Sequence, residues 1–122
     1  MRLIQSGSEF VGTNPDPTCP VEDGLAPECG ASLAALEKCT DRSPTVIGKP
    51  APYIFQTAAR ELKIPFRHIA MIGDRLDTDI LGAHRAGMRS ILALTGCTTE
   101  AMLKGSKIKP GMVVNSLRDI KL

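Results

Sequence analysis

The sequence contains few aromatic residues and no long hydrophobic run. Phe, Tyr and Trp make up 3% of the 122 residues, and Trp is absent. A surface of aromatic side chains that stack on nucleic-acid bases is therefore not expected. No apolar stretch approaches the roughly 20 residues of a membrane-spanning helix, and the first residues lack the apolar centre of a secretion signal. We expect a soluble cytoplasmic protein that binds neither nucleic acid nor membranes.

A strong charge imbalance and paired cysteine motifs are also missing. The net charge of +2 is too small to indicate binding to nucleic acid or to an acidic membrane surface. None of the four cysteines belongs to a Cys-x-x-Cys pair, which argues against a zinc site. Because nothing in the sequence indicates secretion, we expect free thiols rather than disulfides.

What the sequence does contain is an alternation of short strand and helix patterns. Helices are predicted over residues 31–38, 52–62, 78–86 and 99–103, and strands over 10–13, 45–47, 68–72, 90–94 and 113–114. The proline-rich stretch 14–20 and residues 24–30 are predicted to be loops, because proline interrupts helices and strand ladders. Strands that alternate with helices indicate βαβ units, so we predict an α/β fold with a mainly parallel sheet.

Three carboxylates, Asp74, Asp77 and Asp79, follow an apolar run that ends at Gly73. The run has the pattern of a buried strand, and ligands of open α/β sheets bind outside the carboxyl ends of the strands. Carboxylates gathered there repel one another, and a hard cation such as Mg²⁺ would relieve that repulsion. Alternatively, the acids stabilise the start of the following helix, which suits Asp77 best and explains Asp74 less well.

A second candidate is Lys49, in the string Gly48-Lys49-Pro50 between a short strand and the helix predicted at 52–62. Helix N-termini attract phosphate, and a lysine beside one adds a positive charge. A solvated loop lysine is the alternative. Neither a Walker A motif nor a Gly-x-Gly-x-x-Gly motif occurs in the sequence. Taken together in consecutive strand-to-helix loops, Lys49 and Asp74 indicate a phosphate and Mg²⁺ site.

The motifs around these residues resemble those of the haloacid dehalogenase (HAD) superfamily, in the branch of 4-nitrophenylphosphatases and phosphoglycolate phosphatases. The resemblance extends over nearly the whole chain from Phe10, and its strings lie at residues 10–16, 48–50, 71–80, 86–88, 94–99 and 107–110. It implies an incomplete HAD core domain with a three-layer, Rossmann-like, mainly parallel sheet. Residues 1–30 would be the end of a cap and its return linker, and residues 31–122 the C-terminal half of the core.

The same resemblance implies a Mg²⁺-dependent phosphatase that hydrolyses a phosphorylated small molecule through an aspartyl-phosphate. Lys49 would neutralise the nucleophile and the transferring phosphoryl group, and Asp74 would bind Mg²⁺. Asp79 would orient the water shell of the metal. The remaining implied roles are loop support by Arg75 and Thr78, and substrate contact by Asn14 and Asp16 where the chain returns from the cap.

The sequence departs from the family at the nucleophile. The Asp-x-Asp-Gly-Thr segment that follows an N-terminal strand in HAD enzymes is absent. Asp77-Thr78-Asp79 lies at a helix start instead, and Asn14 is an amide, which cannot attack phosphorus as a carboxylate does. Most of the cap, which sets substrate choice, is missing as well. We therefore expect the metal-holding half of a phosphatase site, inactive by itself, and assign no substrate.

Two other hypotheses remain open. The chain could be a non-catalytic, truncated product that binds Mg²⁺ or phosphate, or that associates with itself or with a complementary half through an open sheet edge and apolar face. A receiver-like domain also places acids at strand ends, but it needs acids on a first strand, and Glu9 is a poor match.

Overall fold

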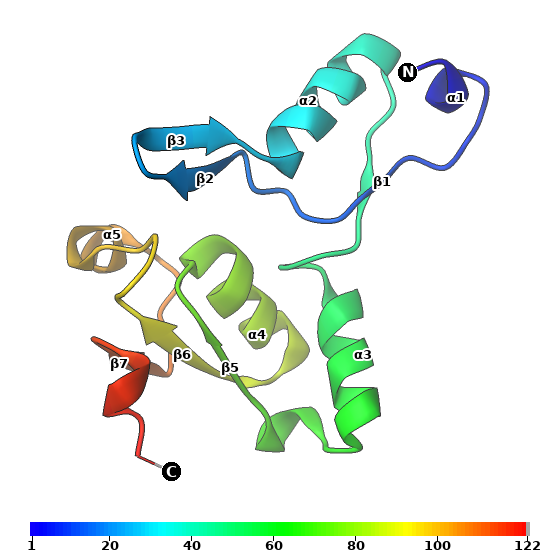
Figure 1. Cartoon of the computed structure of the whole chain (residues 1–122). Coiled ribbons are helices and arrows are strands. Elements are labelled where there is room, and N and C mark those ends of the chain that lie inside the picture. The colour runs from blue at the N-terminus through cyan, green and yellow to red at the C-terminus, as the bar shows by residue number, and fades with distance from the viewer. Residues whose placement is uncertain (122) are drawn as a thin grey trace. The chain divides into compact units, whose positions relative to one another are not determined.

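The computed structural model describes residues 1–121 and has an α/β fold with parallel sheets (Figure 1). The chain divides into two compact units, Met1–Gly48 and a second unit that starts at Lys49, and each is described by itself. The predicted α/β fold class is therefore confirmed. The assignment of residues 1–30 to a cap and 31–122 to a core half stays a prediction.

The first unit contains a parallel strand pair, an antiparallel hairpin and one long helix. Its elements are α1 (Arg2–Gln5), β1 (Val11–Gly12), β2 (Thr18–Val21), β3 (Gly24–Pro27), α2 (Cys29–Thr40) and β4 (Thr45–Val46). Strand β1 pairs with β4 in parallel, and β2 pairs with β3 in antiparallel register. Leu33 of α2 is buried, and it packs where a side chain on Gly12 would stand.

The hairpin corrects the prediction that residues 14–20 and 24–30 are loops. Prolines do lie in it, because Pro20 is opposite Leu25 and Pro27 is opposite Thr18. Glu28 N donates a hydrogen bond to the carbonyl of Pro17, so these two residues form a hydrogen-bonded pair of the antiparallel ladder. Hydrogen-bonded pairs alternate with pairs whose N–H groups point outward, and both Pro20 and Pro27 belong to pairs of the second kind. In a two-stranded ribbon such positions cost no hydrogen bond, so proline is tolerated there.

The second unit alternates between helices and strands, as predicted. Its elements are α3 (Pro52–Leu62), η1 (Phe66–His68), β5 (Ala70–Gly73), η2 (Leu76–Ile80), α4 (Leu81–Ala86), β6 (Arg89–Ala93), α5 (Glu100–Gly105), β7 (Met112–Val114) and η3 (Leu117–Asp119). The three strands form one parallel sheet in the order β5-β6-β7. Figure 1 shows β5 and β6 side by side with α4 next to them.

Two apolar clusters hold this unit together. Phe55, Ala83 and Met88 pack where α3 meets α4, and the ring of Phe55 fills the space that a side chain on Gly82 would need. The second cluster joins η2 to the sheet through Leu76, Ile80 and Leu92, and both Ile80 and Leu92 are fully buried. The turn after β5 is thus packed against the strand next to it, which fixes the acidic segment in place.

Several helix ends agree with the sequence patterns. Gly87 has a φ of 72° and ends α4, as predicted for a glycine after the last helical residue. The hydroxyl of Ser116 accepts the N–H of Arg118 and caps η3, as serine commonly does at a helix start. The segment predicted as a helix from residue 78 begins earlier, with the π-helical turn η2 at Leu76.

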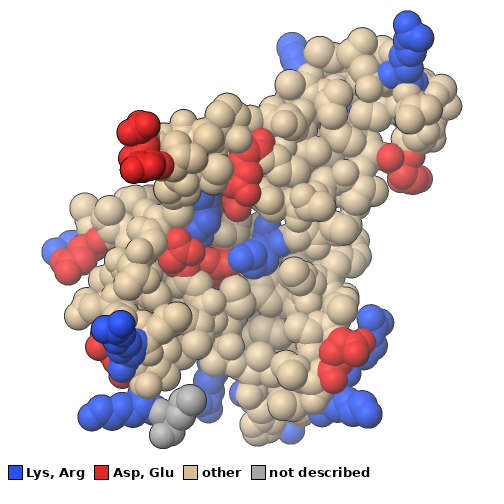
Figure 2. Space-filling view, viewed as in Figure 1, with Lys and Arg blue, Asp and Glu red and all other residues tan. Residues whose placement is uncertain are grey.

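Surface charge is mixed, and the thiols are free. Acidic and basic side chains both appear on the face seen in Figure 2, and neither sign covers it. Cys19, Cys29, Cys39 and Cys97 form no disulfide. Among the helices of residues 1–121, none has both the length and the apolar character needed to cross a membrane.

Candidate functional site

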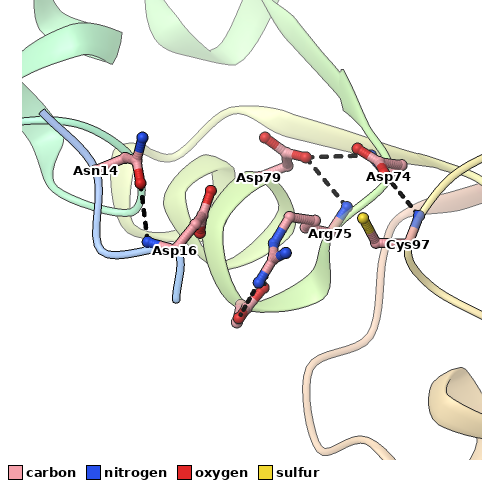
Figure 3. A network of polar contacts seen from close by, with 7 residues as sticks. Asn14, Asp16, Asp74, Arg75, Asp79 and Cys97 are labelled. Atoms are coloured by element: carbon pink, nitrogen blue, oxygen red, sulfur yellow. Dashed lines mark hydrogen bonds and ion pairs between the residues drawn. The ribbon is translucent and has the colours of Figure 1, made fainter. Parts of the chain in front are cut away.

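The carboxylate of Asp79 is the centre of a polar network at the carboxyl end of β5. Its side chain is 3% exposed, and Oδ2 accepts the backbone N–H groups of Asp74 and Arg75, each at 3.1 Å (Figure 3). Its other oxygen, Oδ1, accepts a hydrogen bond from Lys49 Nζ at 2.6 Å. Lys49, just before α3, is thereby joined to the turn after β5. Two of the residues predicted for the site are therefore in direct contact.

Local backbone geometry explains why Asp79 reaches this position. The carbonyl of Arg75 accepts the N–H groups of both Asp79 and Ile80 at 3.1 Å, which makes the wide turn of a π-helix. Such turns are rare and often occur at functional sites. The absence of a side chain on Gly73 is also required, because a Cβ there would overlap the carboxylate of Asp79.

Asp74 fastens the loop after β6 to the loop after β5. Its Oδ2 accepts the backbone N–H of Cys97 at 2.7 Å, and its carbonyl accepts the N–H of Thr98 at 3.1 Å (Figure 3). A Cβ on Gly96 would overlap this carboxylate, so the two loops approach closely only because residue 96 is glycine. The carboxylate therefore lies in a pocket formed by backbone.

The same contacts set the ionisation of Asp74 and Cys97. Partial burial is the largest single effect on the Asp74 carboxyl and opposes its ionisation, but hydrogen bonds from the backbone N–H and the side chain of Cys97, with smaller contributions from the local backbone and the Arg75 charge, together lower its pKa below the ordinary value. Burial raises the pKa of the Cys97 thiol, and the neighbouring Asp74 carboxylate raises it further. Asp74 is thus an anion at neutral pH, and Cys97 is a protonated thiol.

Asp77 lies in the first turn of η2, where the alternative interpretation put it, but its side chain forms no capping hydrogen bond. Its carboxylate accepts hydrogen bonds from Arg75 Nε at 3.3 Å and Nη2 at 3.1 Å, and its side chain is 65% exposed. Asp79 instead satisfies the N–H groups at the turn. Thr78 is buried beside them, and its hydroxyl has no hydrogen-bond partner among residues 1–121. Because Asp77 lies only two residues after Arg75, the guanidinium reaches its carboxylate, and this ion pair takes the place of a capping hydrogen bond.

Asn14 and Asp16 lie in the first unit, after β1. The amide nitrogen of Asn14 donates to Glu28 Oε1 at 3.5 Å. Asn14 Oδ1 accepts the N–H of Asp16 at 2.9 Å (Figure 3). This is the local turn that asparagine commonly forms with the backbone two residues later. The turn accounts for Asn14 structurally, and the predicted substrate contact of Asn14 and Asp16 stays a prediction.

The residues of the second unit provide one carboxylate for a metal ion. Within the described part of the chain, no cluster of three or more His, Cys, Asp or Glu side chains could hold a metal. Asp79 is engaged by Lys49 and Asp77 by Arg75, whereas Asp74 forms no ion pair among residues 1–121. Mg²⁺ takes oxygen ligands, commonly one or two carboxylates with water and phosphate oxygens. Asp74 in its backbone pocket fits one such ligand, and the set is incomplete.

The sequence did not reveal the parts of the site that are made of backbone. The N–H of Cys97 and the space at Gly73 and Gly96 are as important to the geometry as the charged side chains. The only sequence signal for the second loop is the string Leu94-Thr-Gly-Cys, whose glycine permits the close approach.

Comparisons with known proteins show what this chain resembles. A HAD-hydrolase-like family profile matches residues 46–120. Dihydroxyacetone phosphatase from Corynebacterium glutamicum is 34% identical over 120 residues, which cover 98% of this chain and 44% of that protein. The p-nitrophenyl phosphatase from Archaeoglobus fulgidus has a TM-score of 0.88 at 36% identity, covering 97% of this chain and 47% of that one.

A glycerol phosphate phosphatase from Mycobacterium tuberculosis in complex with magnesium is also similar. Its TM-score is 0.85 at 39% identity, with 94% of this chain and 35% of that chain covered. The chain therefore spans less than half the length of these three relatives, and it matches their C-terminal part.

Proposed function

Because this chain belongs to the HAD-like hydrolase family, in its p-nitrophenylphosphatase branch, we propose that it supplies half of the active site of a Mg²⁺-dependent phosphomonoester hydrolase. The observation that carries the proposal is the contact between Lys49 and Asp79, 2.6 Å long, in which the same Asp79 carboxylate also accepts the backbone N–H of Asp74. It puts a fixed positive charge and a metal-binding carboxylate at the carboxyl end of one parallel strand. Phosphoryl transfer depends mainly on positioned charges of this kind.

Lys49 is the phosphate-neutralising group in this proposal. Its side chain is 39% exposed, so the ammonium is held by Asp79 and still accessible to a ligand. The buried Asp79 carboxylate is itself fixed by two backbone N–H groups, which limits the movement of Lys49. A lysine that is positioned before the substrate arrives loses little entropy on binding the phosphoryl group.

Asp74 is the proposed Mg²⁺ ligand. Its lowered pKa keeps the carboxylate ionised, and the N–H of Cys97 fixes its orientation. When bound, Mg²⁺ would neutralise charge on the phosphoryl oxygens. Arg75 and Thr78 would support the turn. Asp79 would be a positioning residue that orients the water shell of the metal. The magnesium complex of the M. tuberculosis relative supports this choice of metal.

The nucleophile comes from outside these residues. No Asp-x-Asp-Gly-Thr segment occurs in the sequence, so an aspartyl-phosphate would form on a second segment of polypeptide. The chain alone is then inactive. The names of the relatives, which act on dihydroxyacetone phosphate and glycerol phosphate, support a phosphorylated small molecule as substrate. Asn14 and Asp16 are the proposed substrate contacts from the first unit, and the cytoplasm is the proposed location.

The second candidate function is non-catalytic binding of Mg²⁺ or of a partner protein. The missing nucleophile favours it, because Asp74 and Lys49 can bind a cation and an anion without any covalent step.

A covalent hybrid separates these two functions. The N-terminal part of the A. fulgidus p-nitrophenyl phosphatase, which this chain does not match, is joined to the start of this chain. The hybrid is assayed with 4-nitrophenyl phosphate and Mg²⁺, next to the chain alone. We expect turnover by the hybrid and none by the chain. A folded hybrid without Mg²⁺-dependent turnover would contradict the catalytic proposal and favour the non-catalytic one.

A further inference from the structure

A cavity lies at the amino ends of the strands in the second unit, at the end of the sheet opposite Asp74. Its volume is about 500 Å³, against about 320 Å³ for the hollow that Asp74 lines. Ala70, the first residue of β5, lines the cavity, and about 10 Å of strand separates it from Gly73. Small-molecule sites commonly enclose roughly 300–1,000 Å³, so the cavity has the size of a ligand site that is separate from the candidate active site.

The charged part of the cavity wall is basic. Arg89 and Lys109 line the cavity, and among the described residues no Asp or Glu does so. The side chain of Arg89 is exposed and forms no ion pair within residues 1–121. A guanidinium without a carboxylate partner can bind a phosphate or carboxylate group through two parallel hydrogen bonds.

Positive charge is concentrated at this end of the sheet. The segments that lead into the three strands are residues 63–69, 87–88 and 106–111, and they contain four Lys and Arg residues and no Asp or Glu. The second unit has six acidic residues, and five of them lie soon after the carboxyl end of a strand instead: Asp74, Asp77, Asp79, Glu100 and Asp119. The amino end of the sheet therefore has an excess of positive charge, which attracts anions.

A buried hydroxyl fixes the polar part of the wall. Ser90 is 3% exposed, and its Oγ accepts the N–H of Gly111 at 3.0 Å and lies 3.2 Å from His84 Nε2. These contacts join α4, β6 and the segment before β7. Lys109 Nζ donates to the carbonyl of Leu103 at 3.0 Å and to the next carbonyl at 3.4 Å. An ammonium has three donors, so Lys109 is held in place and retains one donor for a ligand.

The rest of the wall is apolar and includes two methionines. Met88 is 8% exposed and Met112 is 54% exposed, and both line the cavity. Thioether sulfur makes favourable contacts with aromatic rings. A basic group beside such a surface suits an anion that carries a flat ring better than it suits a bare ion. Single-stranded nucleic acid needs aromatic side chains on which successive bases stack, and within the described residues none lines this cavity.

We propose that this cavity binds a small aromatic anion of the size of a nucleoside monophosphate. The anionic group lies on Arg89 and Lys109, and the ring lies against Met88 and Met112. The inference goes beyond the proposed function and does not depend on it, because the cavity uses no residue of the candidate active site.

Binding of adenosine 5′-monophosphate (AMP) to this chain in the absence of Mg²⁺, followed by amide NMR shifts, tests the proposal. We expect shifts at residues 87–91 and 109–112. AMP should bind more tightly than adenosine, which lacks the charge, and than ribose 5-phosphate, which lacks the ring. Equal affinities for AMP and inorganic phosphate would indicate an adventitious ion only and would overturn the proposal, as would equal affinities for AMP and adenosine. Shifts confined to the segments around Lys49 and Asp74 would also overturn it.

Two matched arginines test the basic wall. Arg89→Gln and Arg85→Gln remove the same charge from exposed side chains, but of the two only Arg89 lines the cavity. We expect Arg89→Gln to weaken AMP binding about tenfold, the scale of one lost hydrogen bond to a charged group, and Arg85→Gln to change it by less than about twofold. Equal effects would mean attraction by net charge alone and would overturn the proposal.

Two matched methionines test the apolar wall. Met112 and Met102 are both 54% exposed, and Met112 lines the cavity whereas Met102, in α5, does not. Met112→Ala should weaken AMP binding about threefold and leave ribose 5-phosphate binding unchanged, because it removes apolar contact with the ring. Met102→Ala should change neither affinity. Equal effects of the two substitutions on AMP binding would overturn the placement of the ring.

Discussion

The carboxylate of Asp79 occupies the space that a side chain on Gly73 would fill. Strand β5 ends at this glycine, and Asp79 folds back over it to accept the two N–H groups that follow. Gly73→Ala should therefore displace Asp79 and lower the free energy of unfolding by about 1–3 kcal/mol, as overpacking in a buried site commonly does. Thermal or urea unfolding measures this change.

Gly105→Ala is the matched control for that substitution. Gly105 is the last residue of α5, and no atom lies within 4 Å of a Cβ placed there. Alanine should change the stability by less than about 1 kcal/mol. Equal decreases in the free energy of unfolding for the two substitutions would show that the close contact between Gly73 and Asp79 does not affect stability.

The ion pair between Lys49 and Asp79 should couple the start of α3 to the β5 turn. Asp79→Asn leaves one acceptor oxygen where two are used, so an amide N–H meets the Lys49 ammonium or the backbone N–H groups of the turn, and we expect a loss of about 1.5–3 kcal/mol, typical for a hydrogen bond to a charged group. Lys49→Met should cost less, because Lys49 is partly exposed. A double-mutant cycle should give a coupling free energy of about 0.5 kcal/mol or more. Strict additivity would refute the coupling.

Mg²⁺ should bind the chain alone weakly and at Asp74. Titration with Mg²⁺, followed by amide NMR shifts, should perturb the loops that meet at the bond from Cys97 N to Asp74. Asp74→Asn should abolish these shifts, and Gly96→Ala should reduce them, because its Cβ would displace the carboxylate. Asp77→Asn, whose carboxylate binds Arg75, is the control and should leave the shifts intact. Shifts that survive in Asp74→Asn would place the metal elsewhere.

Cys29 should form a thiolate at lower pH than an ordinary thiol. The Thr13 hydroxyl, 3.4 Å from Cys29 Sγ, lowers the pKa of the Cys29 thiol most, and the N–H of Asn14 lowers it further. The pH midpoint of Cys29 alkylation by iodoacetamide should therefore lie below that of an ordinary cysteine thiol. Thr13→Val should raise the midpoint, whereas Ser43→Ala, which removes a hydroxyl bonded to Glu37, should not. An unchanged midpoint in Thr13→Val would contradict the assignment.

The sequence predicted those features of the fold that depend on local pattern. The alternation of strands and helices from residue 45 onward and the end of α4 before Gly87 follow from side-chain periodicity and backbone preference. The β2–β3 hairpin was missed because its prolines fall at outward positions, and that depends on register rather than composition.

The candidate site was only partly predictable for a related reason. Lys49, Asp74 and Asp79 could be selected by residue type and spacing, but the partner of each carboxylate depends on tertiary geometry. Asp77 lies in the first turn of η2 and binds Arg75. Asp79, for which the family resemblance implies orientation of the water shell of the metal, accepts the backbone N–H groups of the turn. Backbone donors such as the N–H of Cys97 have no sequence signature.

The hybrid enzyme shows whether Asp74 of this chain takes part in phosphatase chemistry. The measurement is Mg²⁺-dependent hydrolysis of 4-nitrophenyl phosphate by the hybrid carrying Asp74→Asn or Asp77→Asn. We predict that Asp74→Asn lowers turnover by at least about 100-fold, the scale expected when a positioned electrostatic group is lost, while Asp77→Asn retains most of it. Turnover by the Asp74→Asn hybrid equal to that of its parent would contradict the account.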